Sequence, residues 1–116
     1  QDDFLGTASL VHLTKFEEAP IPLDDAGKGI LAHLTVKIEQ LANILKPIRL
    51  TIVGAKGLRH ADYVKGSDPY CICTIKGNVE HKCKTPVVDD TGEPQWNFTH
   101  DFLYFCRSDV LEFEVW

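Results

Sequence analysis

Alternation of apolar and polar residues is the clearest pattern along the chain. Between residues 30 and 39 the even positions are all apolar, whereas His33, Lys37 and Glu39 stand at odd positions. Side chains of a β-strand point alternately to opposite faces, so a period of two predicts a strand with one buried face. Residues 110–116 repeat the pattern, because apolar side chains alternate with two glutamates there.

Several more short strands are expected, each bounded by turn-forming residues. They cover residues 4–10, 50–55, 70–75, 79–87 and 96–105, with a brief strand around Ile21 and Leu23. Residues 39–47 have helical spacing that Pro47 ends, which predicts a connector with room for one or two helical turns. About eight short strands and no long helix predict an all-β fold, an eight-stranded antiparallel Greek-key β-sandwich.

Length and composition are those of one globular domain. The chain has 116 residues, of which 44% are hydrophobic and 25% charged. A net charge of −5 without a basic stripe argues against nucleic-acid binding. No apolar run approaches the roughly 18 residues that span a bilayer, and the acidic start lacks the basic region of a signal peptide. Four cysteines are too few for a small secreted framework, so we expect a reducing, cytoplasmic setting.

The loop from Asp62 to Tyr70 carries the most suggestive chemistry. Asp62 and Asp68 stand six residues apart, and Pro69 follows the second acid at once. Such a loop can fold both carboxylates toward one point. That suits calcium, which takes about 6–8 oxygen ligands in irregular geometry. The alternative is a turn in which Asp68 caps the local backbone and Pro69 fixes the exit.

Six motifs together resemble the first five strands of a C2 domain. They are Leu50–Leu58, Asp62, Ser67-Asp68-Pro69-Tyr70, Lys84-Thr85, Pro94-Gln95-Trp96-Asn97 and Leu111–Trp116. Residues 2–6 resemble the start of the family's sixth strand, and residues 29–38 resemble its eighth. The resemblance therefore implies a single C2-like sandwich over 1–116, with family strands six to eight in 1–38, the connector in 39–47 and strands one to five in 48–116.

This rearranged order has three explanations, and the residues leave all of them open. The chain is a permuted domain, cut at the family's third calcium-binding loop and joined through the connector. Alternatively, it is a piece of a tandem repeat protein, and copies or neighbouring C2 domains complete each other by exchanging halves in a domain swap. A third possibility is that a mobile loop between Trp116 and Gln1 is left out of the sequence.

The resemblance also implies a calcium site and a membrane contact. Asp62 and Asp68 match ligands of the family's first loop, and Asp3 matches the last ligand of its third loop. The Asp-x-Asp pair that the family places after the fifth strand is absent, which implies lower affinity because fewer charged ligands remain. The tip of the first loop is expected to contact the membrane through Tyr63, Val64 and Lys65. The alternative is that Val64 packs under its own loop.

Lys82 and Lys84 flank Cys83 on a predicted strand, so both ammonium groups point to one face. By resemblance this is the lysine-rich strand that contacts phosphoinositides in some family members, which makes phosphoinositide binding a secondary hypothesis. A solvated strand face explains the same spacing.

Cys71, Cys73 and His100 are expected to pack in the fold rather than to bind a metal or to react. Cys71 and Cys73 share one face of a strand, which permits a metal or redox role with His81 and Cys83 nearby. Packing as small apolar side chains is the favoured interpretation, since zinc sites place cysteine pairs in short turns. His100 is expected to be a partly buried structural residue. No nucleophile elbow or phosphate-binding loop is present in the sequence, so we do not expect an enzyme.

The expected function is calcium-regulated binding of anionic phospholipid membranes by a C2 module of a larger multi-domain protein. The module would be peripheral on the cytosolic face. The alternative is a calcium-independent domain for protein interaction or self-association, with a degenerate calcium site. The missing Asp-x-Asp pair, the strand order and Glu93, at a position where the family often has asparagine, favour this alternative.

Overall fold

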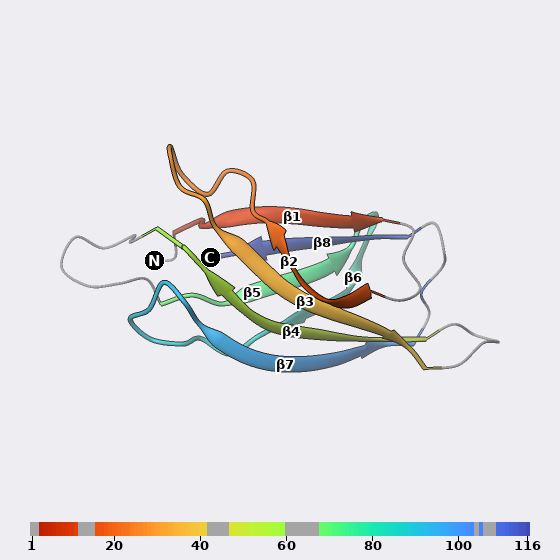
Figure 1. The fold of residues 1–116 in the computed structure, drawn as a ribbon. Helices are drawn as coiled ribbons and strands as arrows, with labels where there is room; N and C mark the ends of the chain where they lie inside the picture. The colour runs from red at the N-terminus through yellow and green to blue at the C-terminus, as the bar shows by residue number, and fades with distance from the viewer. Residues whose placement is uncertain (1–2, 12–15, 42–46, 60–67, 104, 106–108) are drawn as a thin grey trace.

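The computed structural model describes residues 3–11, 16–41, 47–59, 68–103, 105 and 109–116. Within these residues the chain forms eight β-strands and no helix (Figure 1). The strands are β1 (Gly6–Val11), β2 (Phe16–Pro22), β3 (His33–Gln40), β4 (Ile48–Lys56), β5 (Cys71–Ile75), β6 (Asn78–Lys84), β7 (Gln95–Phe102) and β8 (Val110–Val115).

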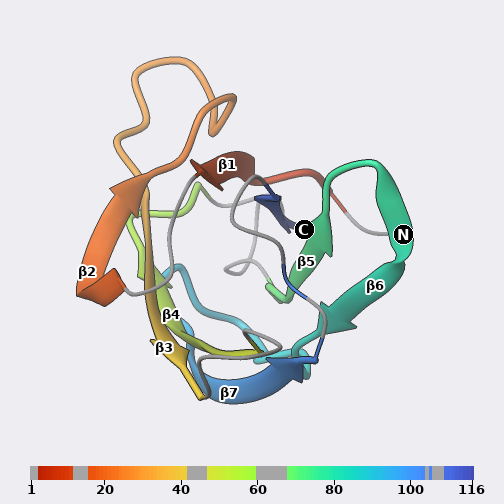
Figure 2. The ribbon, with the colours of Figure 1, turned by 90° about the vertical axis from the view of Figure 1, so that its right-hand side faces the viewer.

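The strands form two four-stranded antiparallel sheets that pack face to face. One sheet has the order β1-β8-β5-β6 and the other has the order β2-β3-β4-β7. Figure 2 looks along the sandwich and shows the two sheets enclosing a common interior. The predicted all-β antiparallel sandwich is therefore confirmed.

The interior is built from the apolar positions of the alternating segments. In β3 the side chains of Leu34, Val36 and Ile38 are buried, and in β8 the same is true of Leu111 and Phe113. These residues belong to one continuous core that both sheets share. The period of two along the sequence thus corresponds to the inward face of each sheet.

Strand ends differ from the sequence-based expectation at several places. The strand expected around Ile21 and Leu23 is longer and includes Pro20 and Pro22. It lies at the edge of its sheet, where a missing backbone N–H removes no ladder bond on the open side. β3 continues to Gln40 and so takes two residues from the predicted connector, whereas residues 42–46 lie outside the described part. β6 and β7 both end about three residues early.

Both ends of the described chain meet along one pair of strands. β1 pairs with β8 over its whole length, beginning with Gly6 opposite Val115. The Leu5 N–H donates to the Val115 carbonyl at 2.7 Å, and the Phe4 ring meets Trp116 edge-on with 5.2 Å between ring centroids. One chain therefore supplies all eight strands of a closed sandwich.

Two glycines with similar backbone angles allow a matched test of packing. Gly57 has φ +74° and Gly77 has φ +80°, a region that costs an L-residue about 1–2 kcal/mol. A Cβ on Gly57 would lie 2.5 Å from the Leu31 carbonyl oxygen, whereas one on Gly77 would meet nothing within 4 Å. We expect Gly57→Ala to lower the free energy of unfolding by about 1–3 kcal/mol more than Gly77→Ala, measured by urea titration. Equal losses of unfolding free energy in the two variants would show that the backbone at Leu31 moves aside without a measurable cost.

Candidate functional site

Several segments that are distant in the sequence meet at one end of the sandwich, called here the loop pole. β3 begins beside the end of β4, because His33 pairs with Lys56. Gln95 pairs with Gly54, and Cys71 pairs with Val115. The loop pole therefore contains the described residues 3–5, 23–32, 57–59, 68–70, 85–94 and 116, and it is the left-hand end of Figure 1.

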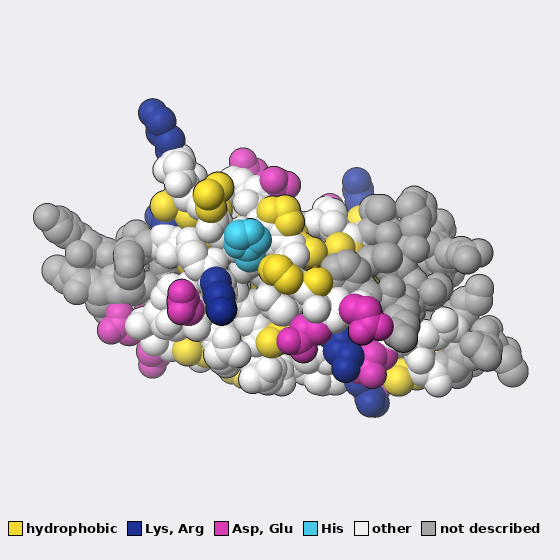
Figure 3. All heavy atoms as spheres, viewed as in Figure 1, with side chains coloured by type: hydrophobic (Ala, Val, Ile, Leu, Met, Phe, Trp, Pro, Cys, Tyr) yellow, Lys and Arg dark blue, Asp and Glu magenta, His cyan; other side chains and the backbone are white. Residues whose placement is uncertain are grey.

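Exposed carboxylates are concentrated at the loop pole. Seven acidic side chains there are exposed, and all of them are oxygen donors of the kind that calcium prefers. They are Asp3, Asp24, Asp25, Asp68, Asp89, Asp90 and Glu93. The pole also contains Lys28, which is exposed, and Arg59, which is half-buried, and acids and bases are interspersed on the face shown in Figure 3. The pole therefore supplies the donor type, carboxylate oxygen, that a hard divalent cation takes.

Asp68 fastens two loops of the pole to each other. Its Oδ1 accepts the backbone N–H of Asp90 at 2.7 Å, and Asp90 has φ +53°. The Pro69 carbonyl accepts the Val88 N–H at 3.1 Å and the Trp96 Nε1–H at 3.3 Å. The Asp68 carboxylate thus accepts a backbone N–H from residues 85–94, and its predicted cap on the local turn stays a prediction because residues 60–67 lie outside the described part.

The other predicted ligands are placed only in part. Asp3 is exposed at the pole, beside Phe4 and Trp116. Asp62 lies outside the described residues, as does the predicted membrane tip of Tyr63, Val64 and Lys65. Among the residues that are described, no three histidine, cysteine or acidic side chains are grouped closely enough to hold a metal ion. Convergence of Asp3, Asp62 and Asp68 stays a prediction.

The loop at residues 23–32 is a part of the pole that sequence reasoning did not assign to the site. It is anchored by reciprocal bonds, in which the Thr7 and Asp24 N–H groups donate to each other's carbonyls at 2.9 and 2.8 Å. Leu31 on this loop is 86% exposed. Nearby, Arg59 Nη2 donates to the Phe4 carbonyl at 2.9 Å. Knowing that β2, β3 and β4 are consecutive antiparallel neighbours would have placed this loop at the pole.

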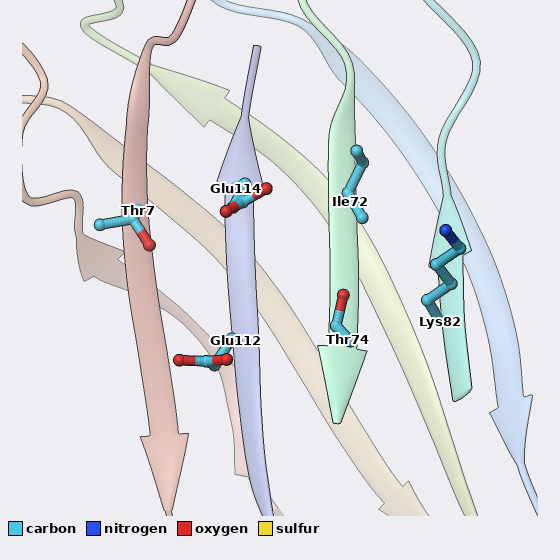
Figure 4. Close-up of a pocket in the computed structure, with 6 residues that line it drawn as sticks. All are labelled: Thr7, Ile72, Thr74, Lys82, Glu112 and Glu114. Atoms are coloured by element: carbon cyan, nitrogen blue, oxygen red, sulfur yellow. The ribbon is translucent and has the colours of Figure 1, made fainter. Parts of the chain in front are cut away.

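Lys82 and Lys84 are exposed on the outer face of β6, so their predicted common face is confirmed. Lys84 Nζ lies 4.4 Å from the centroid of the Tyr70 ring, a cation–π contact. Lys82 lines a hollow of about 360 Å³ on the outer face of the sheet, shown in Figure 4. Its other lining residues are Thr7, Ile72, Thr74, Glu112 and Glu114.

The hollow has mixed charge because of the strand register. Thr74 stands opposite Lys82 on one side and Glu112 on the other. β5 therefore lies between the two glutamates of β8 and Lys82 of β6 (Figure 4). They reduce the attraction of this face for a polyanion. Phosphoinositide binding by Lys82 and Lys84 stays a prediction.

The predicted burial of Cys71, Cys73 and His100 is confirmed. Cys71 and Cys73 are fully buried in the core, and Cys83 is 8% exposed. His100 is half-buried, and its ring meets Phe102 edge-on at 4.6 Å. Within the described part of the chain, no helix is long and apolar enough to cross a bilayer.

Comparison with known proteins places these observations in a family. The family model for the C2 domain matches residues 46–116. Synaptotagmin-4 of Arabidopsis thaliana is 37% identical over 70 residues, which cover 60% of this chain and 12% of that protein. The chain therefore spans about an eighth of the length of that curated relative.

Solved structures agree with the sequence comparison. A C2 domain of RIM from Drosophila superposes with a TM-score of 0.67 at 28% identity, covering 75% of this chain and 73% of that one. A C2 domain of RIM2 gives a TM-score of 0.62 at 26% identity, with 72% of each chain covered. The match to residues 46–116 spans β4 to β8, the segment predicted to hold the first five family strands. The rearranged order of residues 1–38 stays a prediction.

Proposed function

The chain belongs to the C2 domain family, and from this premise we propose that it is a calcium-regulated module that binds anionic phospholipid membranes. The observation that carries the proposal is the loop pole. There Asp68, in the family's Ser-Asp-Pro-Tyr motif, ties the first loop to a second acidic loop. Asp68, Asp89, Asp90 and Glu93 are all exposed to solvent.

The proposed mechanism is electrostatic. Without a cation, the seven exposed acids of the pole repel an anionic surface. Calcium, when bound, supplies positive charge and coordination positions for lipid phosphate oxygens. Asp3, Asp62 and Asp68 are the residues proposed to hold it. The hydrogen bond from the Asp90 N–H to Asp68 holds the two segments together before calcium binds. The conformational entropy lost on binding is therefore smaller.

We further propose that Tyr63, Val64 and Lys65 enter the membrane interface once the acids are neutralised. One basic residue near an anionic surface contributes about 1 kcal/mol, and burial of the apolar side chains adds to it. Lys82 and Lys84 are a secondary contact for phosphoinositides, weakened by Glu112 and Glu114. The parent protein would be a larger, multi-domain one, and the module would act without catalysis at the cytosolic face.

Sedimentation with lipid vesicles tests the proposal. With vesicles of mixed phosphatidylserine and phosphatidylcholine, the chain is expected to pellet in calcium and to stay in solution in a calcium chelator. Phosphatidylcholine vesicles alone should not pellet it, because they lack the anionic charge. Equal pelleting with and without calcium would favour the calcium-independent alternative, and failure to pellet in any condition would overturn membrane binding.

A further inference from the structure

Three of the four cysteines form a cluster in the interior of the sheet β1-β8-β5-β6. Cys71 and Cys73 lie on the inward face of β5, and Cys83 lies on the inward face of β6. The register places Cys73 directly opposite Cys83. All three are free thiols in the structure. The membrane mechanism makes no use of them.

The geometry of this strand pair suits a cross-strand disulfide. The Thr85 N–H donates to the Cys71 carbonyl at 2.9 Å, so residues 71 and 85 form a hydrogen-bonded rung. Hydrogen-bonded pairs recur every two residues along an antiparallel ladder, so Cys73 and Cys83 form the next hydrogen-bonded pair. The Cα atoms of such a pair are about 5.5 Å apart. Disulfides join Cα atoms about 4.4–6.8 Å apart and Cβ atoms about 3.5–4.5 Å apart, so the Cα spacing fits and bond formation must draw the two Cβ atoms, about 4.5–5.5 Å apart in such a pair, closer together. Cys71 faces Thr85 and so has no thiol opposite it.

The two thiols of the pair differ chemically. A hydrogen bond from the Cys73 thiol holds the pKa of Cys83 below its ordinary value. Burial, together with that bond and the neighbouring thiols, raises the pKa of Cys73. Cys83 is therefore the more acidic thiol of the pair, and thiolates are the species that react with peroxides. Cys73 is placed to act as a resolving thiol.

Cys83 is also the member of the pair that is closest to solvent. It is 8% exposed, whereas Cys73 is 0% exposed. It lies on β6, which ends its sheet and pairs only with β5 among the described strands. Together with Ile72, Lys82 and Lys84, it lines a hollow of about 230 Å³. Lys82 and Lys84 point to the outer face of β6, away from the inward-facing Cys83 thiol, so access to the thiol depends on opening of the strand, and an edge strand opens more readily than a central one.

We propose that Cys83 and Cys73 are an oxidation site for a hydroperoxide, at which they form a reversible disulfide between β5 and β6. The Cys83 thiolate attacks one oxygen of hydrogen peroxide, the O–O bond breaks, and the departing hydroxide takes a proton to become water, which leaves a sulfenic acid on Cys83. The Cys73 sulfur then attacks the Cys83 sulfur. The S–O bond breaks, and a second water leaves with the thiol proton. Two thiols lose two electrons in total, and one peroxide accepts them.

Oxidation would covalently fix the edge strand that carries Lys82 and Lys84. Exchange of β6 amide hydrogens with solvent should therefore slow by roughly tenfold or more, because local opening of the strand is then restricted. This inference does not depend on calcium or membrane binding.

Mass spectrometry of the folded chain tests the site. The reduced protein is treated with hydrogen peroxide, remaining thiols are blocked with N-ethylmaleimide, and the protein is digested without reductant. We expect a product lighter by two hydrogens whose cross-linked peptides join Cys73 to Cys83, and dithiothreitol should reverse it. A disulfide that joins Cys71 or Cys106 instead, or the absence of any disulfide, would overturn the proposal.

Matched cysteine variants sharpen the assignment. Cys71→Ala and Cys106→Ser should keep the cross-link, whereas Cys83→Ala should abolish it. Cys73→Ala should stop the reaction at a sulfenic acid on Cys83, which dimedone traps. Mapping of the cross-link in the unaltered chain needs no substitution, so the proposal stays testable if a core variant fails to fold. If Cys73→Ala formed a cross-link in the same yield as the unaltered chain, the proposal would also be overturned.

Discussion

Replacing Asp68 with asparagine is expected to weaken calcium-dependent sedimentation with phosphatidylserine vesicles while leaving the fold intact. Asparagine keeps a side-chain oxygen that can accept the Asp90 N–H, now 2.7 Å from the Asp68 Oδ1, so the tether between the two loops survives. The negative charge is lost, and calcium affinity falls with the number of charged ligands. The calcium concentration for half-maximal sedimentation should rise by at least about tenfold.

Two further variants separate charge from structure. Asp89→Asn makes the same change of charge at an exposed position of the same pole and should leave the calcium dependence nearly unchanged. Asp68→Ala removes both the charge and the tether, so it should also lower the free energy of unfolding by about 1 kcal/mol. If Asp68→Asn needs the same calcium concentration for half-maximal sedimentation as the unaltered chain, Asp68 is a structural residue only.

Leu50→Ala is expected to have the largest effect on stability, a loss of about 2–5 kcal/mol. Leu50 is fully buried on β4, where it stands between Ile38 of β3 and His100 of β7. Truncation leaves a cavity between two sheets that cannot collapse without shifting paired strands. Since domains of this size are stable by only about 5–15 kcal/mol, urea titration should show a much lower midpoint at a similar slope.

Leu103→Ala is the matched control for this substitution. It deletes the same atoms from a side chain that is 60% exposed. Its free energy of unfolding should stay within about 0.5 kcal/mol of the unaltered chain. Comparable losses in the two variants would mean that Leu103 packs against another part of the chain in solution.

Much of the fold could be predicted from the sequence because strands have a local signature. The alternation in residues 34–38 and 111–115 corresponds to the buried positions of β3 and β8, whereas residues 30–32, predicted to begin the first of these strands, lie before β3. The boundaries were harder to predict. Pro20 and Pro22 look like strand breakers in isolation, yet β2 lies at an edge, where they are tolerated. Whether a strand is central or at an edge depends on the other strands, which a local pattern does not reveal.

Some features of the candidate site could likewise be predicted from the sequence, and others could not. The Ser-Asp-Pro-Tyr motif predicted Asp68 as a calcium ligand, which stays a prediction, and the spacing of Lys82 and Lys84 predicted their shared face. Neither pattern indicated that Asp68 would accept a bond from Asp90, 22 positions away, or that Glu112 would stand across β5 from Lys82. Those relations depend on the register between strands.

The sequence by itself determined which side of each strand is buried and which motifs point to the family, because periodicity and motif spacing are properties of consecutive residues. The tertiary structure alone decided which acids share the loop pole and which thiol faces Cys83. It also decided that the loop at residues 23–32 lies at the loop pole. The physical reason is that hydrogen bonds between strands join residues far apart in the chain, and their register follows from packing of the whole core.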